Sequence, residues 1–381
     1  MTGDSRDGVA VLCPGGLEYS GGIGRAMAYL LAQWASEESA RTTIAIDTRG
    51  GGRLILAPWF FLVALLRLAW LRLSGRISLV HINIASRGSA ARKCVVVLLC
   101  AALRLRFVMH LHGAQFDQFY ASLPNPGKFA VRWMFRRAAR VIVLGDVWRR
   151  FVVDKLRVPF DRIDVICNGV PAPAASSPPH RGPVHIVFLG RLGDRKGVPE
   201  LLAALSSDRL SGLEWRATLA GDGEIERFRA EASRRGLTAR IEFPGWVGQT
   251  EAASILASGD IFVLPSYNEG LPVAVLEALA HGIATVATPV GSLAEFLTDR
   301  DQVLFVPPGD VDALTGALER LVVSADTRRV LGENGRLVFR RHFDIAATAR
   351  AVRQSHDAAW EPRMKVAGYG GFVAPPASNE G

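Results

Sequence analysis

Two carboxylates stand eight positions apart in the segment SYNEGLPVAVLEALA, at Glu269 and Glu277. The apolar run IFVLPS (261–266) precedes them and Pro272 follows the Glu269-Gly270 turn, so the pattern predicts a strand, a turn and a helix. The start of a helix offers unpaired backbone N–H groups and the positive end of the helix dipole, which favour phosphate. Carboxylates would repel a phosphate bound at this helix start. We therefore expect Glu269 and Glu277 to bind sugar hydroxyls, one on each side of the phosphate. The alternative for each glutamate is a solvated helix residue.

Two cations, Arg191 and Lys196, follow the apolar run VHIVFLG (184–190). The run predicts a strand, and we expect Lys196 to open the next helix, so both side chains should lie at the carboxyl edge of one sheet. Two cations there can neutralise a diphosphate, and arginine can do so with two parallel hydrogen bonds. A solvated basic loop is the alternative.

A glycine-rich segment, Gly21-Gly22-Ile23-Gly24, follows the first apolar run of the chain. Glycines ahead of a helix let the backbone approach a phosphate or a sugar closely, although such segments are also common as tight turns. The segment lacks the full glycine fingerprint of dinucleotide-binding proteins, and no ribose-binding acid follows at a distance of about 20 residues. Both observations argue against a nicotinamide cofactor.

His110 and His112 lie two residues apart in RFVMHLHG (106–113), a predicted strand. Alternate residues of a strand share a face, so we expect the two rings to point the same way. A metal site would need a third ligand, which the sequence does not place nearby. We expect His110 to be packed in the core and His112 to face the ligand cleft at the end of the strand.

Two Asp-x-Asp pairs, Asp299 with Asp301 and Asp310 with Asp312, match a metal-binding pattern. The second pair stands at a predicted helix start, where aspartates cap the helix and favour its dipole, and the first pair lies in a polar loop. We expect structural roles for both pairs, and we predict no metal and no cofactor.

The segment that contains Glu269 and Glu277 resembles the signature of the family-4 glycosyltransferases, retaining enzymes with the two-domain GT-B fold. The first half of the chain matches that family more loosely. The resemblance extends over most of the second half, through FLGRLGDRKGVPELLAAL (188–205), LAGDGEIERF (219–228), FPGWV (243–247) and PVGSLAEFL (289–297).

The resemblance implies a role for each of the residues introduced above. Glu269 and His112 would contact the transferred sugar, Glu277 the ribose hydroxyls, and Arg191 and Lys196 the leaving diphosphate. Glu269, His112, Lys196 and Arg191 are accordingly the predicted catalytic residues. The other predicted substrate-binding positions are glycines and backbone groups at loop edges: Gly21, Gly22, Gly24, Gly221, Val247, Gly270 and Leu271.

These residues need elements that bring them to one place. Six short apolar runs in each half of the chain, separated mostly by helix-length stretches, predict an α/β fold of two Rossmann-like doubly wound domains that face a central cleft. The chain of 381 residues also exceeds what one core usually organises. The predicted divisions are a first domain (1–170), a linker (171–183), a second domain (184–343), a last helix that can cross back (344–362) and a disordered tail (363–381).

Positive charge and apolar segments are concentrated in the first half. The net charge is +9 overall, +12 over residues 1–170 and −3 over the remainder. LILAPWFFLVALL (54–66), which arginines follow, and RKCVVVLLCAALRLR (92–106) are both too short to span a bilayer. They suit either crossover helices buried on the sheet or helices that lie on an anionic membrane with aromatic side chains in the interface. No nucleic-acid-binding module is recognisable, so no nucleic acid is expected.

Composition narrows the class of protein further. Apolar residues make up 49% of the chain, and the four scattered cysteines have no metal-finger spacing, which indicates a globular protein of a reducing compartment. The polar N-terminus is unlike a signal peptide.

We therefore predict a retaining, metal-independent hexosyltransferase of exopolysaccharide or cell-envelope glycan synthesis, cytoplasmic and peripheral on the inner face of the membrane. Its donor would be GDP-mannose or a UDP-hexose and its acceptor a lipid-linked glycan. Mannose is suggested because HLHGAQFDQFY (110–120) resembles bacterial exopolysaccharide glycosyltransferases, several of which transfer that sugar. A non-catalytic nucleotide-sugar-binding protein and another Rossmann-type nucleotide-dependent enzyme are the open alternatives.

Overall fold

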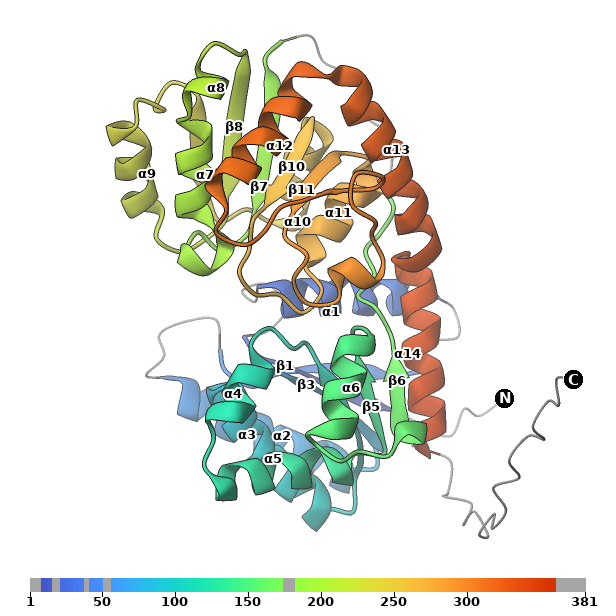
Figure 1. Cartoon of the computed structure of the whole chain (residues 1–381). Coiled ribbons are helices and arrows are strands. Elements are labelled where there is room, and N and C mark those ends of the chain that lie inside the picture. The colour runs from blue at the N-terminus through green and yellow to red at the C-terminus, as the bar shows by residue number, and fades with distance from the viewer. Residues whose placement is uncertain (1–7, 16–20, 38–40, 51–55, 174–181, 361–381) are drawn as a thin grey trace, which may run out of the picture.

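Each half of the chain forms a parallel six-stranded sheet with helices on both sides, and the two domains lie one above the other (Figure 1). Most of the predicted linker, the whole predicted tail and the start of the first apolar segment lie outside the described residues. The computed structural model describes residues 8–15, 21–37, 41–50, 56–173 and 182–360.

The first sheet is built from the apolar runs of the first half. Every residue of β1 and β3 is buried, because helices cover both faces of a parallel sheet. The strands, in the spatial order β2-β1-β3-β4-β5-β6, are β1 (Val9–Cys13), β2 (Thr43–Asp47), β3 (Leu79–Ile84), β4 (Arg106–Leu111), β5 (Arg140–Val143) and β6 (Ile163–Val165). The helices are α1 (Gly22–Ala35), α2 (Ala57–Leu73), α3 (Gly88–Ala102), α4 (Phe116–Ser122), α5 (Asn125–Arg137) and α6 (Asp146–Asp154).

The second sheet repeats this construction with a restarted set of apolar runs. Its strands, in the spatial order β12-β11-β10-β7-β8-β9, are β7 (Val184–Leu189), β8 (Trp215–Ala220), β9 (Ile241–Gly245), β10 (Ile261–Leu264), β11 (Ala284–Ala287) and β12 (Leu304–Phe305). Its helices are α7 (Val198–Leu205), α8 (Asp208–Ser211), α9 (Ile225–Arg234), α10 (Gln249–Ala257), α11 (Val273–His281), α12 (Val311–Val323) and α13 (Ala325–His342).

In each sheet the strand order reverses beside the first strand of the domain. β1 has β2 on one side and β3 on the other, and β7 has β8 on one side and β10 on the other. Ligands of open parallel sheets bind outside the carboxyl ends of the strands at such a switch point. The two places where the fold favours a ligand are therefore the β1/β3 switch point of the first domain and the β7/β10 switch point of the second.

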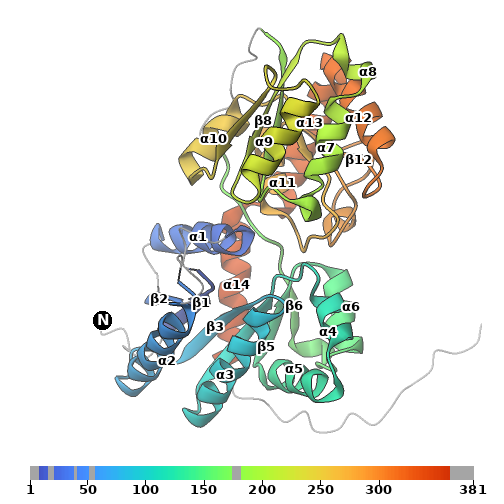
Figure 2. The same cartoon turned by 90° about the vertical axis from the view of Figure 1, so that its left-hand side faces the viewer.

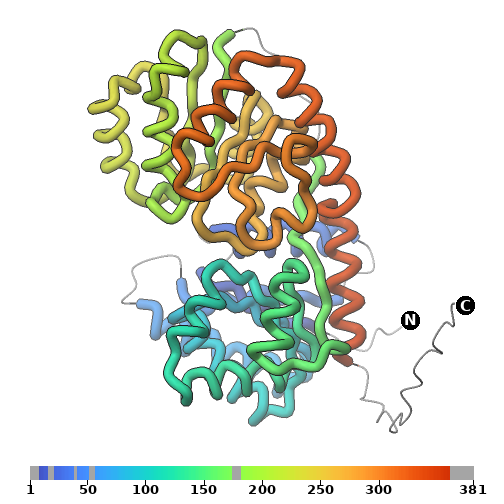
Figure 3. The backbone as a smooth tube through the Cα atoms, viewed as in Figure 1, coloured from blue at the N-terminus to red at the C-terminus, as the bar shows by residue number. Residues whose placement is uncertain are grey.

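The chain crosses between the domains at two neighbouring places (Figure 3). Val170, shortly before the linker, donates its backbone N–H to Phe343 at 2.9 Å, just before the last helix begins. That helix, α14 (Ile345–Trp360), returns along the first domain, where Trp34 Nε1 donates to the Ala349 carbonyl at 3.2 Å. The end of the described chain is therefore part of the first domain's packing.

Helix α2 exposes much of its apolar surface. It lies beside α3 on the outside of the first domain (Figure 2) and buries only Ala64, Leu68 and Leu71. Helix α2 is a crossover helix between β2 and β3, as one of the two interpretations expects, but only a narrow side of it is buried. No helix in the described part of the chain is long and apolar enough to cross a bilayer. The large apolar side chains that α2 leaves exposed are Trp59, Phe60, Leu62, Val63, Leu66, Trp70 and Leu73.

Candidate functional site

The turn between β10 and α11 lies where the carboxyl edges of the two sheets meet. Helix α11 begins at Val273 with Pro272 as its N-cap, so Pro272 precedes the first helical position rather than occupying it. A Cβ atom on Gly270 would lie 2.5 Å from the backbone oxygen of His112 in the first domain. Only glycine permits this approach, so Gly270 brings the predicted donor-binding turn and the His112 loop into contact. The adjacent Leu271 carbonyl accepts a hydrogen bond of 2.8 Å from Asn168 Nδ2.

Three of the predicted donor-binding residues gather at the β7/β10 switch point. Lys196 and Glu269 form an ion pair in which both side chains are largely buried. Arg191 is mostly exposed and lies 3.7 Å from Asp222. A cavity of about 270 Å³ is lined by the segment from Arg191 to Lys196 together with Glu224. The two cations thus share one cavity, and Glu269 reaches it through its pairing with Lys196.

The local geometry of Lys196 differs from the sequence expectation. It ends a 3-10 turn (Asp194–Lys196), whereas the sequence pattern predicts that it opens helix α7. Gly197, with a left-handed φ of 70°, separates the turn from the helix. A Cβ on Gly197 would lie 2.1 Å from the Pro265 carbonyl oxygen, so this glycine packs the turn against the end of β10. That packing brings Lys196 within reach of Glu269.

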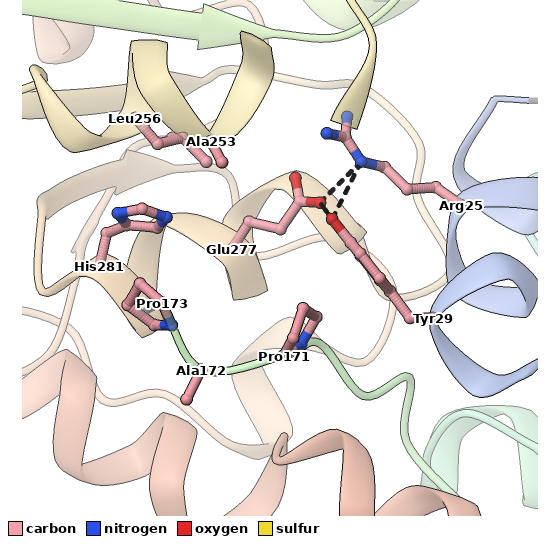
Figure 4. A pocket seen from close by; sticks show the side chains of 9 residues that line it. All are labelled: Arg25, Tyr29, Pro171, Ala172, Pro173, Ala253, Leu256, Glu277 and His281. Carbon is pink, nitrogen blue, oxygen red and sulfur yellow. Dashed lines mark hydrogen bonds and ion pairs between the residues drawn. The ribbon is translucent and has the colours of Figure 1, made fainter. Parts of the chain in front are cut away.

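Glu277 is buried in α11 and is held by two side chains of the first domain (Figure 4). Arg25 Nε lies 2.7 Å from its Oε1, and the Tyr29 hydroxyl donates to the same oxygen at 2.5 Å. Its Oε2 is buried and has no hydrogen-bond partner among the described residues. Burial raises the pKa of the Glu277 carboxyl above its ordinary value, while Arg25 and Tyr29 act in the opposite sense. One carboxylate oxygen is therefore fixed by the first domain, and the other has no donor among the described residues.

Sequence reasoning missed Arg25 and Tyr29. They lie four residues apart on α1, directly after the glycine-rich segment, and therefore on one face of that helix. A cavity of about 210 Å³ adjoins this contact, between α1, the start of the linker, α10 and α11. The i, i+4 spacing could have suggested a shared target, but nothing local to α1 indicates that the target is Glu277 in the other domain.

His112 is buried at the end of β4, and its hydrogen bonds determine its tautomer. Asn83 donates from Nδ2 to the Leu12 carbonyl at 3.2 Å, so its Oδ1 faces His112 Nε2 at 2.7 Å. An amide oxygen can only accept, so His112 carries its proton on Nε2 and has its lone pair on Nδ1. Burial lowers the pKa of His112 to about 3, with a smaller contribution from His81. His112 is thus a neutral hydrogen-bond acceptor, suited to a sugar hydroxyl.

A row of buried histidines continues from His112 to α14. The rings of His110 and His112 lie with centroids 4.0 Å apart, His110 Nδ1 is 3.1 Å from His81 Nε2, and His81 Nδ1 is 2.9 Å from His356 Nε2. Burial lowers the pKa of His81 to about 4 and those of His110 and His356 well below the ordinary value. His110 is packed in the core, as the sequence predicts. Within the described ranges no three His, Cys, Asp or Glu side chains are arranged to hold a metal ion.

A second contact between the domains joins the end of β5 to the segment after β11. The Glu295 carboxylate accepts backbone N–H bonds from Asp146 at 2.6 Å and Val147 at 2.8 Å, at the start of α6. A negative group at a helix N-terminus is favourable, so Glu295 caps α6 from the opposite domain. Glu295 lies in the matching segment PVGSLAEFL (289–297), where no local signal indicates this contact with α6.

The remaining predicted positions lie on the same loop edges. Gly21 and Gly22 begin α1, and a Cβ on either would meet no heavy atom within 4 Å. Gly24 is buried in the first turn of α1. Gly221 has a φ of 150° and packs against the Gly190 carbonyl at the end of β7, and Val247 is buried after β9. All five lie at the carboxyl edges of the sheets that contain the cavities.

The two Asp-x-Asp pairs have structural roles, as predicted. Asp310 accepts the Ala313 backbone N–H at 2.9 Å and caps α12. Asp299 accepts the Phe305 backbone N–H at 2.8 Å, and the side chain of Asp301 is hydrogen-bonded to Asn334.

Family models match both domains. Residues 23–172 match the model described as Glycosyltransferase Family 4, and residues 183–324 match the model described as Glycosyl transferases group 1. Together the two models cover about three quarters of the chain. These matches confirm the family resemblance predicted from the sequence.

Named relatives are similar over part of their length. The glycogen synthase of Mycobacterium tuberculosis is 28% identical over 225 residues, which cover 58% of this chain and 54% of that protein. The putative colanic acid biosynthesis glycosyltransferase WcaL of Escherichia coli is 29% identical over 195 residues, covering 49% and 48%. The chain thus spans about half the length of these curated relatives.

Solved structures share the whole architecture. Sucrose-phosphate synthase from Thermosynechococcus elongatus has a TM-score of 0.74 at 19% identity, covering 92% of this chain and 98% of that chain. Anabaena HepE in complex with UDP-glucose has a TM-score of 0.74 at 16% identity, covering 92% and 99%. At these identities the likeness concerns the fold, and it confirms the predicted class of two doubly wound domains of the GT-B type.

Proposed function

Since the chain belongs to the glycosyltransferases of group 1 and family 4, with the GT-B fold, we propose that it is a retaining, metal-independent hexosyltransferase. It would move a hexose from a nucleotide-diphosphate sugar to a lipid-linked or membrane-associated saccharide. The observation that carries the proposal is the cavity at the β7/β10 switch point, which holds Arg191 and Lys196 beside the Glu269 turn.

The cations of this cavity would stabilise the leaving diphosphate. As the anomeric bond breaks, negative charge collects on the phosphate oxygen, where Arg191, Lys196 and the backbone N–H groups at the start of α11 can receive it. Lys196 is already positioned by Glu269, so its ammonium group needs little rearrangement to meet a phosphate. The departing phosphate oxygen can itself accept the proton of the acceptor hydroxyl, and no separate protein base is then required.

Glu269, His112 and Glu277 would hold the sugar and the ribose. Neutral His112 offers Nδ1 as an acceptor to a hydroxyl of the transferred sugar, from the loop that Gly270 brings close to Glu269. The unpartnered Oε2 of Glu277 suits a ribose hydroxyl, because a buried carboxylate oxygen without a donor is costly. Contact between the two domains at these points would exclude water and limit hydrolysis of the donor.

The identity of the donor is tested most directly by thermal shift. GDP-mannose and UDP-hexoses are the proposed donors, and the likeness to HepE, whose structure contains UDP-glucose, adds support for a UDP-sugar. A bound donor raises the melting temperature by mass action. GDP-mannose, UDP-glucose, UDP-N-acetylglucosamine and UDP-galactose would each be tested, followed by NMR of the anomeric proton of the transfer product. No shift with any of them, or an inverted product, would contradict the proposal.

Metal independence has its own assay, in which the best donor is used with and without EDTA. We expect the transfer rate to be unchanged, because cations of the protein would take the place of a metal at the diphosphate. A complete loss that an added divalent metal restores would refute this part of the proposal.

The exposed apolar face of α2 would dock on an anionic membrane, on the cytoplasmic side. Trp59, Leu66 and Trp70 are exposed, and arginines at 67, 72 and 76 supply the charge that anionic headgroups attract. Leu66→Glu with Trp70→Glu should abolish sedimentation with phosphatidylglycerol vesicles. Leu337→Glu, at an equally exposed position of the second domain, is the control. Wild-type protein that stays in the supernatant even at low salt would exclude docking.

A further inference from the structure

The β1/β3 switch point of the first domain also gathers cations. Helix α3 follows β3, and Arg92 folds back over its start, with Nη1 3.6 Å from the position that a Cβ on Gly88 would occupy. The Arg92 Nε atom is buried and has no hydrogen-bond partner among the described residues. Arg49, exposed just after β2, is close enough to lower the pKa of Arg92, after the larger effect of burial. Two guanidinium groups and the N-terminus of a 15-residue helix therefore converge at one edge.

Lys93 lies directly behind these arginines and is fully buried. Its Nζ donates to Thr48 Oγ1 at 2.9 Å, and within the described chain it forms no ion pair. The carboxylate that acts on it, Asp47, is already occupied by three backbone N–H groups at 2.8–3.0 Å, those of Gly15, Arg49 and Gly50. A buried ammonium without a carboxylate partner is destabilising, so its presence beside two more cations indicates a site that is completed by an anion.

Backbone strain marks the same place. Arg87, the residue before α3, has a φ of 57°, which side chains other than glycine rarely adopt. Such strain persists where the surroundings impose it, and it is common at ligand sites. The strained residue, the unpartnered Arg92 Nε and the buried Lys93 all lie on α3 or at its start.

We propose that Arg49, Arg92 and the start of α3 bind a phosphate or diphosphate group of the acceptor, with Lys93 supplying positive potential from behind. The assignment to the acceptor rests on the proposed transferase function, because the donor diphosphate is expected at the β7/β10 switch point of the other domain. A protein that carries a second phosphate-binding edge, facing the same interdomain space, takes a phosphorylated acceptor. The acceptor class is therefore a saccharide that carries a phosphate or a diphosphate, free or attached to a lipid.

Calorimetric titration with inorganic pyrophosphate tests the site. Arg191→Ala with Lys196→Ala removes both cations of the donor cavity, so binding that remains reports on the first domain. Adding Arg49→Gln and Arg92→Gln to that variant should weaken the remaining binding by about tenfold or more, because two charge-assisted contacts are lost. Lys93→Met should weaken it by a smaller factor.

The control removes the same charge elsewhere in the first domain. Arg150 and Arg157 are exposed, and Arg150→Gln with Arg157→Gln in the same Arg191→Ala, Lys196→Ala background should leave pyrophosphate binding unchanged. Equal pyrophosphate affinity in the test pair and the control pair would overturn the proposal. Circular dichroism would establish that all variants are folded, and Arg49→Lys with Arg92→Lys should retain most of the binding.

Two further measurements connect the site to its ligand. Geranyl pyrophosphate should compete with inorganic pyrophosphate, and tighter binding of the geranyl compound would identify a lipid-linked acceptor, whereas equal binding would identify a free one. If Arg49→Gln with Arg92→Gln weakens only sedimentation with phosphatidylglycerol vesicles and not pyrophosphate binding, the arginines belong to a membrane surface and the proposal is wrong.

The same double variant with an intact donor cavity should keep the thermal shift that the donor produces in the wild type. Failure of every donor would refute the transferase function without affecting the pyrophosphate result.

Discussion

The two switch points of this molecule hold a lysine each, and the lysines are in opposite electrostatic situations. Lys196 of the second domain is paired with Glu269, so its charge is compensated within the protein. Lys93 of the first domain is fully buried, with the neutral Thr48 hydroxyl as its hydrogen-bond acceptor and two arginines nearby. A paired cation is positioned for chemistry at little cost in stability, whereas an unpaired one lowers stability until an anion arrives. The corresponding edges of the two sheets thus carry one lysine that is paired within the protein and one that is not.

The largest expected effect concerns the paired lysine. Lys196→Ala should lower the transfer rate by roughly 100- to 1000-fold, the usual loss when one donor to a developing negative charge is removed. Steady-state kinetics with the best donor measures it. Arg216→Ala, exposed on β8 of the same domain, is the control and should transfer at the wild-type rate. A near-normal transfer rate of Lys196→Ala would show that the paired lysine does not take part in the reaction.

Replacing the unpaired lysine, Lys93, should make the protein more stable. Lys93→Met is expected to raise the free energy of unfolding at pH 7 by on the order of 3 kcal/mol, because a buried cation is replaced by an apolar side chain of similar length. Urea denaturation measures this change. Lys155→Met, at an exposed position of the same domain, should have almost no effect.

The stability that Lys93→Met gains over the wild type should depend on pH. Burial lowers the pKa of Lys93 from 10.5 to about 7, so between these values the unfolded chain holds a proton that the folded protein does not. The free energy of unfolding of the wild type therefore rises with pH across this window, and the advantage of Lys93→Met should shrink towards pH 10. An advantage that is absent at pH 7, or that grows with pH, would show that Lys93 is compensated after all.

The contact of Arg25 and Tyr29 with Glu277 allows a test of whether the first domain helps the second domain to bind the nucleotide. Tyr29→Phe removes the hydroxyl that donates to Oε1 while it leaves Arg25 in place. A hydrogen bond to a charged group contributes about 1.5 kcal/mol, so the Kd of the nucleotide should rise roughly tenfold. Isothermal titration with the nucleoside diphosphate measures it, and Tyr120→Phe, whose hydroxyl donates to the Lys155 carbonyl within the first domain, is the control. Unchanged affinity would mean that the first domain does not position Glu277.

The parts of this site that could be predicted from sequence are those with local signals. Strand β10, the Glu269 turn and the cap at Asp310 follow from apolar runs, proline and aspartate at fixed offsets. The cavity of Arg191 and Lys196 follows from the rule that parallel strands end at one edge.

The rest depends on pairings across long stretches of chain. Tyr29 and Glu277 are 248 residues apart, and Val147 and Glu295 are 148 apart, so no local pattern joins them. Lys93 lies at the basic end of an apolar segment, and no local pattern there indicates that its side chain is buried. Its burial depends on how α3 packs over the end of β2, which only the assembled sheet determines.

The smallest expected effect concerns Glu295, the cap that the second domain provides for α6. Glu295→Gln keeps an acceptor oxygen but removes the charge that interacts with the helix dipole, a loss of about 0.5–1 kcal/mol. Amide hydrogen exchange at Asp146 and Val147 should accelerate by roughly two- to fivefold, because both N–H groups are held by this carboxylate. Glu319→Gln breaks an exposed ion pair with Arg209 within the second domain and should leave exchange at α6 unchanged. Equal exchange in both variants would mean that the contact at α6 does not hold the domains together, and that the contacts of Glu277, Gly270 and Leu271 are the ones that matter.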